Sequence, residues 1–315
     1  MRARKVLVAF GGNALVERGE DATQREQTRR ADELARTLSR IVSAGNRLVL
    51  VHGNGPQVGD ALIRSETAIY QVPPLPLDVC VAESQGSIGF LLEKALRNAM
   101  RGWPGGGPDP VTVLTQVLVR ANDPQLKRPT KPVGPYYPRY RSQELRRRRG
   151  WRMIEEPGRG FRRVVASPRP VEFLGLELIA TLLRQGRIVI AGGGGGIPVI
   201  RTPEGLRGVE AVIDKDHTAA LLAKKLRIDL FVILTDVEGV YENYGKEDQR
   251  LVPRLSVARA RRGVRSGEYP PGSMGPKVAA AADFASATGH EVLITTASRL
   301  QDGVAGRAGT RIVPA

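Results

Sequence analysis

The sequence predicts an α/β protein in which a mainly parallel sheet is covered by helices on both faces. The first observation is a series of short runs that are almost wholly apolar, as expected of strands buried on both sides. The second is that segments with a helical period lie between these runs, an alternation typical of parallel sheets. The expected strands are Val6–Phe10, Leu48–His52, Val111–Val119, Ile188–Ala191, Leu230–Thr235, Val292–Thr295 and Arg311–Val313.

The expected helices carry apolar residues at the spacing of one helical face. In the first, Leu34, Leu38, Ile41 and Val42 fall at i, i+4, i+7 and i+8, and Gly45 follows as a stop signal. The same kind of pattern occurs in Ile88, Leu91, Leu92 and Leu96, in Leu174, Leu178 and Leu182, and in Ala219, Leu222 and Leu226. A further helix is expected at Val278–Ala287.

Residues 120–168 interrupt this alternation. They include seven prolines and the run Arg146–Arg149. A compact domain rarely contains a plain loop of this length, so the stretch is predicted to be a small inserted subdomain or lid.

The basic residues are concentrated in the same stretch. The chain has 315 residues and a formal net charge of +16. Residues 120–163 hold 14 Lys+Arg against 4 Asp+Glu, so +10 of the excess lies there. A strong basic excess indicates nucleic acid, an anionic membrane surface or acidic substrates as partners, but here it describes one segment rather than the whole protein.

The remaining composition is that of an ordinary globular protein, with 41% hydrophobic and 25% charged residues. One Cys and three widely separated His exclude a disulfide framework and a zinc site. The apolar run after the basic N-terminus is too short for a signal peptide, and no segment approaches the ~18 apolar residues of a membrane span. We therefore expect a soluble, cytoplasmic protein with no membrane partner.

Glycines follow several expected strands at the point where each strand ends. The first strand leads into Gly11-Gly12-Asn13, the second into Gly53-Asn54, and the fourth into the five glycines Gly192–Gly196. The strand Leu230–Thr235 runs into Asp236. Ligands of open parallel sheets bind beyond these carboxyl ends, where glycine lets backbone N–H groups approach an anion. The pattern predicts a phosphate site.

Several common phosphate-binding motifs are absent. The chain has neither the Walker sequence G-x-x-x-x-G-K-[ST] nor the dinucleotide fingerprint G-x-G-x-x-G. It also lacks the H-R-D and D-F-G motifs of protein kinases. The predicted phosphate site therefore has a different layout.

Three lysines lie in settings unlike those of ordinary surface lysines. Lys131 follows Pro129-Thr130, Lys215 lies at an expected strand-to-helix junction, and Lys277 opens the helix expected at Val278–Ala287. A lysine at a helix start opposes the helix dipole, which a bound anion would explain. An ordinary exposed lysine remains an alternative for each. Asp216 either positions the ammonium groups or only favours the start of its helix.

Seven blocks occur in a fixed order along nearly the whole chain: Gly11–Ala14, His52–Gly59, Glu83–Gly89, Pro129–Pro135, Gly192–Pro198, Gly208–Asp216 and Pro271–Lys277. Together they resemble the carbamate kinases of the amino acid kinase family. The blocks around Lys131 and Lys277 are much more specific to carbamate kinases than the others.

The resemblance implies a three-layer αβα sandwich with a small protruding lid, assembled as a homodimer. It implies reversible phosphoryl transfer between carbamoyl phosphate and ADP, which gives carbamate and ATP, with Mg²⁺ as cofactor. It also implies one amino acid kinase domain with an N-terminal carbamate lobe (residues 1–205), a lid at about residues 120–168, and a C-terminal nucleotide lobe (residues 206–315).

The resemblance also assigns roles to individual residues. The catalytic residues would be Lys131, Lys215, Lys277 and Asp216. The carbamoyl and phosphoryl groups would be surrounded by Gly11, Gly12, Asn13, Gly53 and Asn54. The nucleotide would be bordered by Gly192, Gly193, Gly194, Lys215, Asp236, Tyr244, Gly245, Met274 and Lys277. No side chain is expected to bind the metal directly, because the nucleotide phosphates can hold most of the Mg²⁺ shell.

Two alternatives remain open at this point. One is a kinase of the same fold that phosphorylates another acceptor, such as an amino-acid carboxylate, a phosphonate or UMP. The other is a nucleic-acid-binding protein that uses the arginine-rich segment with its tyrosines and Trp151. Nucleic acid is the weaker partner, since it would leave the glycines and lysines outside that segment unexplained.

Overall fold

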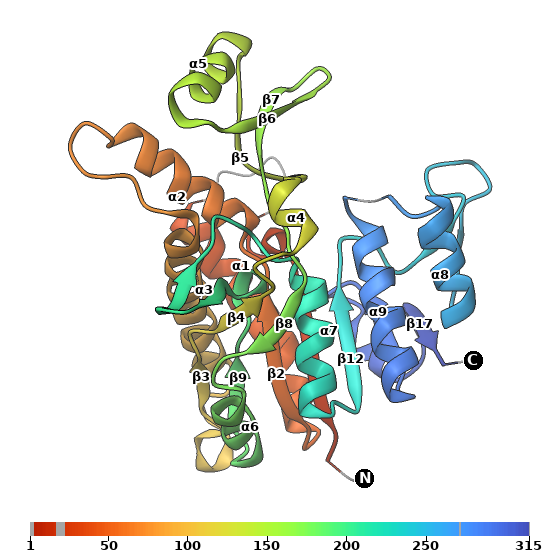
Figure 1. The fold of residues 1–315 in the computed structure, drawn as a ribbon. Coiled ribbons are helices and arrows are strands. Elements are labelled where there is room, and N and C mark those ends of the chain that lie inside the picture. The colour runs from red at the N-terminus through yellow and green to blue at the C-terminus, as the bar shows by residue number, and fades with distance from the viewer. Residues whose placement is uncertain (1–2, 17–22, 271, 315) are drawn as a thin grey trace.

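An eight-stranded sheet runs through the protein (Figure 1). The computed structural model describes residues 3–16, 23–270 and 272–314, apart from the side chain of Asn13; Pro271 of the last sequence block lies outside them. Along the chain the strands of this sheet are β1 (Lys5–Phe10), β2 (Arg47–His52), β3 (Pro110–Thr112), β9 (Ile188–Ile190), β12 (Leu230–Leu234), β15 (Arg254–Ser256), β16 (Val292–Thr295) and β17 (Thr310–Val313).

The order of these strands in space is β15-β17-β16-β12-β1-β2-β9-β3. Every neighbouring pair is parallel except β16 and β17. The mainly parallel sheet expected from the sequence is confirmed.

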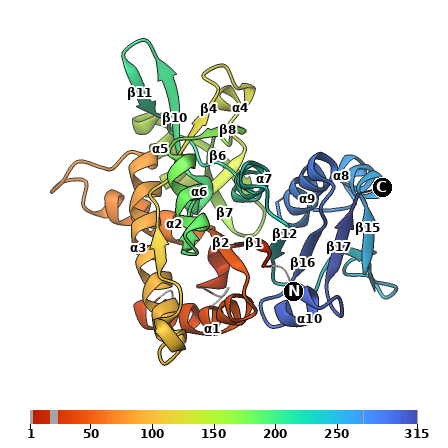
Figure 2. The same ribbon diagram turned by 90° about the horizontal axis from the view of Figure 1, so that it is seen from below.

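Helices cover both faces of this sheet (Figure 2). One face packs against α1 (Gln24–Ser43), α3 (Leu77–Ala99) and α10 (Leu300–Val304). The other packs against α6 (Leu176–Arg184), α7 (Lys215–Leu226), α8 (Val257–Ser266) and α9 (Met274–Thr288). Successive side chains of a strand point to opposite faces, so in β1 Val6 and Val8 enter the first core while Leu7 and Ala9 enter the second. The three-layer αβα fold is confirmed.

A second sheet holds β4 (Gln116–Val119), β8 (Pro170–Phe173), β10 (Ile197–Thr202) and β11 (Gly205–Gly208), in the order β11-β10-β4-β8. The single strand expected at Val111–Val119 is therefore wrong, because the chain leaves the main sheet after β3 and enters the second sheet at β4. The break lies at Thr115, whose backbone N–H donates to the Gln85 side chain instead of to a neighbouring strand.

The basic insertion forms a separate unit above the main sheet (Figure 1). It contains α4 (Pro124–Lys127), α5 (Arg139–Arg149) and a sheet of β5 (Lys131–Tyr137), β7 (Gly160–Val165) and β6 (Arg152–Glu156), in that spatial order. The chain leaves the second sheet at β4 and returns at β8, which pairs with β4. The two ends of the insertion are therefore adjacent. We call residues 120–168 the lid.

The apolar face expected for α6 is wrong. Leu178 is 54% exposed, whereas Ile179 and Leu183 are buried. The helix begins only after Gly175, whose φ of 78° lies in the left-handed region, so Leu174 falls outside it. The buried face is displaced by one residue from the pattern in the sequence.

The remaining elements are short or lie near the site. They are α2 (Gly55–Thr67), the hairpin β13 (Tyr241–Glu242) and β14 (Arg250–Leu251), and the 3-10 turns η1 (Gly12–Ala14), η2 (Pro104–Gly106) and η3 (Gly193–Gly195). None of the helices described in the structure has the length and apolar character needed to cross a membrane. The expected lobe boundary between residues 205 and 206 falls at the start of β11, and the division into lobes stays a prediction.

Candidate active site

Four parallel strands end side by side at one edge of the main sheet. Phe10, the last residue of β1, pairs with His52 in β2 and with Leu234 in β12. Ile190, the last residue of β9, pairs with Leu50 in β2. The segments that begin at this edge are Gly11-Gly12, Gly53-Asn54, Gly192–Gly196 and Thr235-Asp236.

The five consecutive glycines form a tight turn against the end of β2. Gly192 and Gly194 have φ of 67° and 66°, a region in which a side chain is strained. A Cβ on Gly194 would collide with the side-chain amide of Asn54, and a Cβ on Gly193 would collide with the ring of His52. Glycine is required here because the turn packs directly on these two side chains.

Gln85 on α3 holds this turn in place, and sequence reasoning did not assign it a role. Its Oε1 accepts from the Thr115 backbone N–H at 2.7 Å, and its Nε2 donates to Gly193 O at 2.8 Å. Thr115 Oγ1 in turn accepts from the Gly192 N–H at 2.8 Å. The signal in the sequence is the polar pair Ser84-Gln85, which lies four and three residues before Ile88 and so continues the expected apolar face of this helix.

Asp216 joins two of the three singled-out lysines. Its Oδ1 lies 2.6 Å from Lys215 Nζ and its Oδ2 lies 3.0 Å from Lys277 Nζ. All three side chains are largely buried, and the exposed fraction of the Asp216 side chain is only 4%. Lys215 is the first residue of α7, but the segment before it is not a strand as expected, since only Ala211 forms an isolated bridge there.

The pKa values of these groups reflect burial opposed by ion pairing. Burial favours the neutral amine and lowers the pKa of Lys215, although Asp216 acts against this. Burial acts the same way on Lys277, but Asp216, Asp214 and Asp236 together outweigh it and raise the pKa. Burial also disfavours the charged form of Asp216, yet Lys215 and Lys277 hold its pKa below the usual value. The carboxylate is therefore ionised at neutral pH.

Lys131 approaches the same place from the lid. Its Nζ lies 3.4 Å from Asp214 Oδ2 and 3.4 Å from the carbonyl oxygen of Ile213. Asp214 is also the N-cap of α7, because its Oδ1 accepts from the Asp216 backbone N–H at 2.9 Å. Burial raises the pKa of Asp214, but Lys131, His217 and Lys215 more than reverse this and lower it.

These lysines border one cavity of about 210 Å³, which we call the lysine cavity. The expected site residues that line it are Gly12, Gly53, Asn54, Lys131, Gly194, Lys215, Asp216 and Lys277. Segments more than 260 positions apart thus contribute to one concave surface. Gly192 and Gly193 do not line the cavity, and their hydrogen bonds with Thr115 and Gln85 hold the turn that contributes Gly194 to it.

Arg162 of β7 also lines the lysine cavity, and sequence reasoning missed it. Its Nε donates to the carbonyl oxygen of Gly134 at 2.9 Å. The register of β5 and β7 shifts between Val133 and Tyr136, which removes Gly134 from the ladder and leaves its carbonyl available. In the sequence Arg162 is one of many lid arginines, and no motif distinguishes it.

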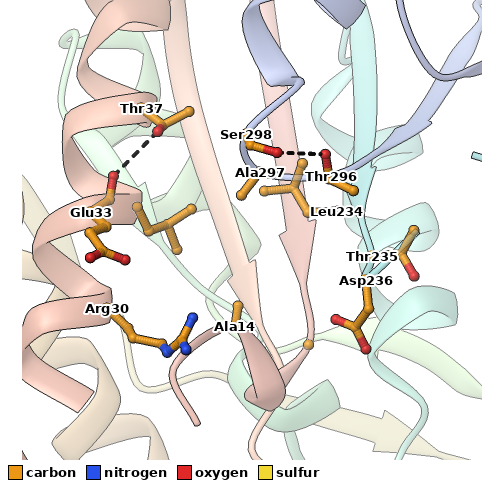
Figure 3. Close-up of a pocket in the computed structure, with 12 residues that line it drawn as sticks. Ala14, Arg30, Glu33, Thr37, Leu234, Thr235, Asp236, Thr296, Ala297 and Ser298 are labelled. Atoms are coloured by element: carbon orange, nitrogen blue, oxygen red, sulfur yellow. Dashed lines mark hydrogen bonds between the residues drawn. The ribbon is translucent and has the colours of Figure 1, made fainter. Parts of the chain in front are cut away.

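A larger cavity of about 770 Å³ lies beside α1 (Figure 3). Arg30, Glu33 and Thr37 of α1 lie on one side of it, with Asp236 and the segment Thr296–Ser298 on the other. Gly11 lines this cavity, whereas its neighbour Gly12 lines the lysine cavity. The expected nucleotide residue Asp236 therefore follows β12 and lines this cavity rather than the lysine cavity, although it lies near enough to Lys277 to raise its pKa.

Besides Gly192 and Gly193, three expected nucleotide residues line neither cavity. Tyr244 is 59% exposed and follows β13, where its ring lies 5.8 Å from that of Tyr241. Gly245 follows it with a φ of 80°. Met274 is the first residue of α9 and packs on the neighbouring hydrophobic core. The side chain of Asn13 lies outside the described part of the chain.

The arginine run of the lid has two different environments. Arg146 donates to Met153 O at 2.8 Å and lies over the Phe161 ring, and Arg149 lies over Trp151. Arg147 and Arg148 are exposed on α5. Arg146 and Arg149 therefore contact aromatic side chains of the lid, although Arg146 is itself exposed, whereas Arg147 and Arg148 form a solvated face.

Comparisons with known proteins match this architecture. The model of the amino acid kinase family matches residues 4–296. A carbamate kinase of Thermococcus kodakarensis is 41% identical over 314 residues, which cover 98% of this chain and 99% of that protein. The chain belongs to the carbamate kinases of the amino acid kinase family.

Two further relatives extend this assignment. The structure of carbamate kinase from Giardia lamblia bound to AMP-PNP has a TM-score of 0.92 and 38% identity, with 100% of this chain and 99% of that chain covered. The carbamate kinase-like protein YqeA of Escherichia coli is 42% identical, covering 98% of this chain and 99% of that protein. The carbamate kinase fold is thus present from end to end.

Proposed function

We propose that this protein is a phosphotransferase that moves a phosphoryl group reversibly between carbamoyl phosphate and ADP, giving carbamate and ATP. The observation that carries the proposal is the pair of buried ammonium groups, Lys215 and Lys277, held by Asp216 beside a glycine turn. Full-length similarity to proteins named carbamate kinase supports the same reaction.

The residues of the site suit this chemistry. Carbamate is already an anion, so its oxygen can attack phosphorus without a general base. Such a loose, in-line transfer needs positioning and charge neutralisation more than proton movement. Lys215 and Lys277 supply fixed positive charge where charge develops on the phosphoryl oxygens, and Lys131 supplies it from the lid.

The two substrates are proposed to meet in the lysine cavity. Gly11, Gly12, Asn13, Gly53 and Asn54 would surround the carbamoyl and phosphoryl groups at the ends of β1 and β2. On the nucleotide side we propose the glycines of the turn, the two lysines and four residues outside the lysine cavity, Asp236, Tyr244, Gly245 and Met274. The last four border no part of the lysine cavity, so they are candidates for the outer part of the nucleotide.

Mg²⁺ is proposed to enter with the nucleotide. The described residues contain no cluster of three or more His, Cys, Asp or Glu side chains that could hold a metal ion. Both oxygens of Asp216 are engaged by lysines. Phosphate oxygens and water would therefore provide most of the coordination, which Mg²⁺ commonly prefers, and the ion would neutralise phosphate charge.

We further propose a cytoplasmic homodimer. Exposed apolar side chains occur on α3 and on segments close to it, namely Val79, Phe90, Leu114 and Leu206. Helix α3 packs on β3 and β10, which adjoin the last two. Apolar surface of this kind is typical of interfaces, and Phe90→Asp is expected to convert dimer to monomer in sedimentation experiments.

One assay tests the reaction directly. ATP formation is measured with ADP, Mg²⁺ and carbamoyl phosphate, and in the reverse direction ADP formation is compared for carbamate, an amino-acid carboxylate, a phosphonate and UMP as acceptors. The proposal predicts ATP formation from carbamoyl phosphate and, in the reverse direction, ADP formation with carbamate far above that with the other three acceptors. Preference for another acceptor would identify a kinase of the same family with a different substrate.

A further inference from the structure

The orientation of the Asn54 side-chain amide follows from the protons around it. Ser84 has a single hydroxyl proton, and its Oγ donates to Val81 O at 2.6 Å. A carbonyl oxygen can only accept, so the Ser84 proton is committed there. Ser84 Oγ must therefore accept from Asn54 Nδ2, which lies 2.8 Å away. The NH₂ of Asn54 faces Ser84, and its carbonyl oxygen points elsewhere.

That carbonyl oxygen is available to a ligand. Asn54 is only 4% exposed, yet it lines the lysine cavity. Its Oδ1 has no hydrogen-bond partner among the described residues. The atom is also not completely shielded from solvent. Oδ1 is therefore reached from the cavity, where a bound molecule can donate to it.

The other polar side chains around the cavity suit a ligand that accepts hydrogen bonds rather than one that donates them. Lys131, Lys215, Lys277 and Arg162 all bring N–H donors to the cavity. The carboxylate of Asp216 is engaged by two of these lysines. Phosphate oxygens only accept, so they match the donors but gain nothing from an additional carbonyl oxygen. Asn54 Oδ1 requires a substrate group that carries protons.

Carbamoyl phosphate has one such group, the NH₂ of the carbamoyl moiety. We propose that Asn54 Oδ1 accepts a hydrogen bond from this NH₂ and selects carbamoyl over acyl phosphates, with Ser84 as the positioning residue that keeps the amide turned. This inference rests on the proposed function, and it adds how the substrate is distinguished. A site built to bond an N–H group discriminates strongly against an analogue that lacks it.

Acetyl phosphate provides the matched probe, because a methyl group replaces the NH₂ and the phosphate is unchanged. ATP formation from ADP is measured with each donor, and the ratio of the two kcat/KM values is compared between variants. In Ser84→Ala the amide is free to turn, and the ratio is expected to fall roughly 10-fold in favour of acetyl phosphate, the scale of one modest hydrogen bond. Activity with acetyl phosphate should change little.

Two further variants make the test specific. Ser87→Ala removes a hydroxyl one turn further along α3 that donates to Ser84 O and does not line the cavity, so the ratio should stay at the wild-type value. Asn54→Leu keeps the shape of the side chain but has no acceptor, and it should lower the ratio at least as much as Ser84→Ala. If thermal melting shows that Ser84→Ala is unfolded, the ratio in Asn54→Leu tests the proposal instead.

The outcomes separate the inference from the proposed function. An unchanged ratio in Asn54→Leu, or an equal loss with both donors, would overturn the role of Asn54 while the kinase activity stands. Absence of ATP formation from carbamoyl phosphate by the wild-type protein would instead overturn the proposed function, and the selectivity with it.

Discussion

Lys277 Nζ lies 3.0 Å from Asp216 Oδ2, although 61 positions separate the two residues in the chain. The other oxygen of the same carboxylate holds Lys215. One buried carboxylate faces two ammonium groups, so it orders them without cancelling their charge. The net positive charge that remains is available to an anionic phosphoryl group.

We expect Lys215→Ala and Lys277→Ala each to lower kcat by roughly 10²–10³, the scale for removal of one donor to a transition state. The measurement is the initial rate of ATP formation at saturating substrates. Lys225→Ala, on the exposed side of α7, is the matched control and should retain wild-type turnover. Near-wild-type turnover in either buried-lysine variant would contradict the proposed roles.

Lys131 contacts Asp214 from the lid, so its removal should affect the reaction more than the nucleotide. We expect Lys131→Ala to lower kcat clearly, with a smaller change in the dissociation constant for ADP measured by calorimetry. Lys127→Ala, which changes an exposed lysine at the end of α4, serves as the control. Equal losses of turnover and ADP binding would argue against the proposal that Lys131 acts from the lid on the reaction itself.

The arginine run should divide into structural and solvated members. Arg146→Ala removes a hydrogen bond to Met153 O and a contact with Phe161, and is expected to cost about 1 kcal/mol of unfolding free energy in urea. The double change Arg147→Gln and Arg148→Gln should leave kcat/KM and its salt dependence almost unaltered. A marked fall in kcat/KM at low salt would show that these arginines attract the anionic substrates.

The pH dependence of stability should report on His52. Burial lowers the pKa of His52 to about 4, against about 6.5 in an unfolded chain. Between these values the unfolded chain binds the proton and the folded protein does not, so stability falls as the pH decreases. The loss is on the order of 3 kcal/mol by pH 4.

Urea unfolding at pH 7 and pH 4.5 measures this loss. His52→Gln removes the titrating group and should show a smaller decrease than the wild-type protein, whereas His290→Gln, at an exposed position, should behave like wild type. The same decrease in all three proteins would mean that carboxylates, rather than His52, dominate acid unfolding.

Much of the fold could be predicted because its signals are local. An apolar run followed by glycine at Gly11, Gly53 and Gly192 marks a buried strand that ends where the backbone must turn tightly. Prediction failed at Thr115 and at Leu178 for different reasons. The strand break at Thr115 depends on a bond to Gln85 from a distant helix, and the face of α6 depends on where Gly175 lets the helix begin.

The sequence by itself determined the alternation of buried strands and helices in the main sheet, the glycine turns and the identity of the unusual lysines, since each follows from neighbouring residues. Only the tertiary structure decided that Asp216 joins Lys215 to Lys277, that Arg162 reaches the cavity from the lid, and which way the amide of Asn54 faces. These arrangements depend on which strands become neighbours in the sheet, and therefore on packing between segments that are remote along the chain.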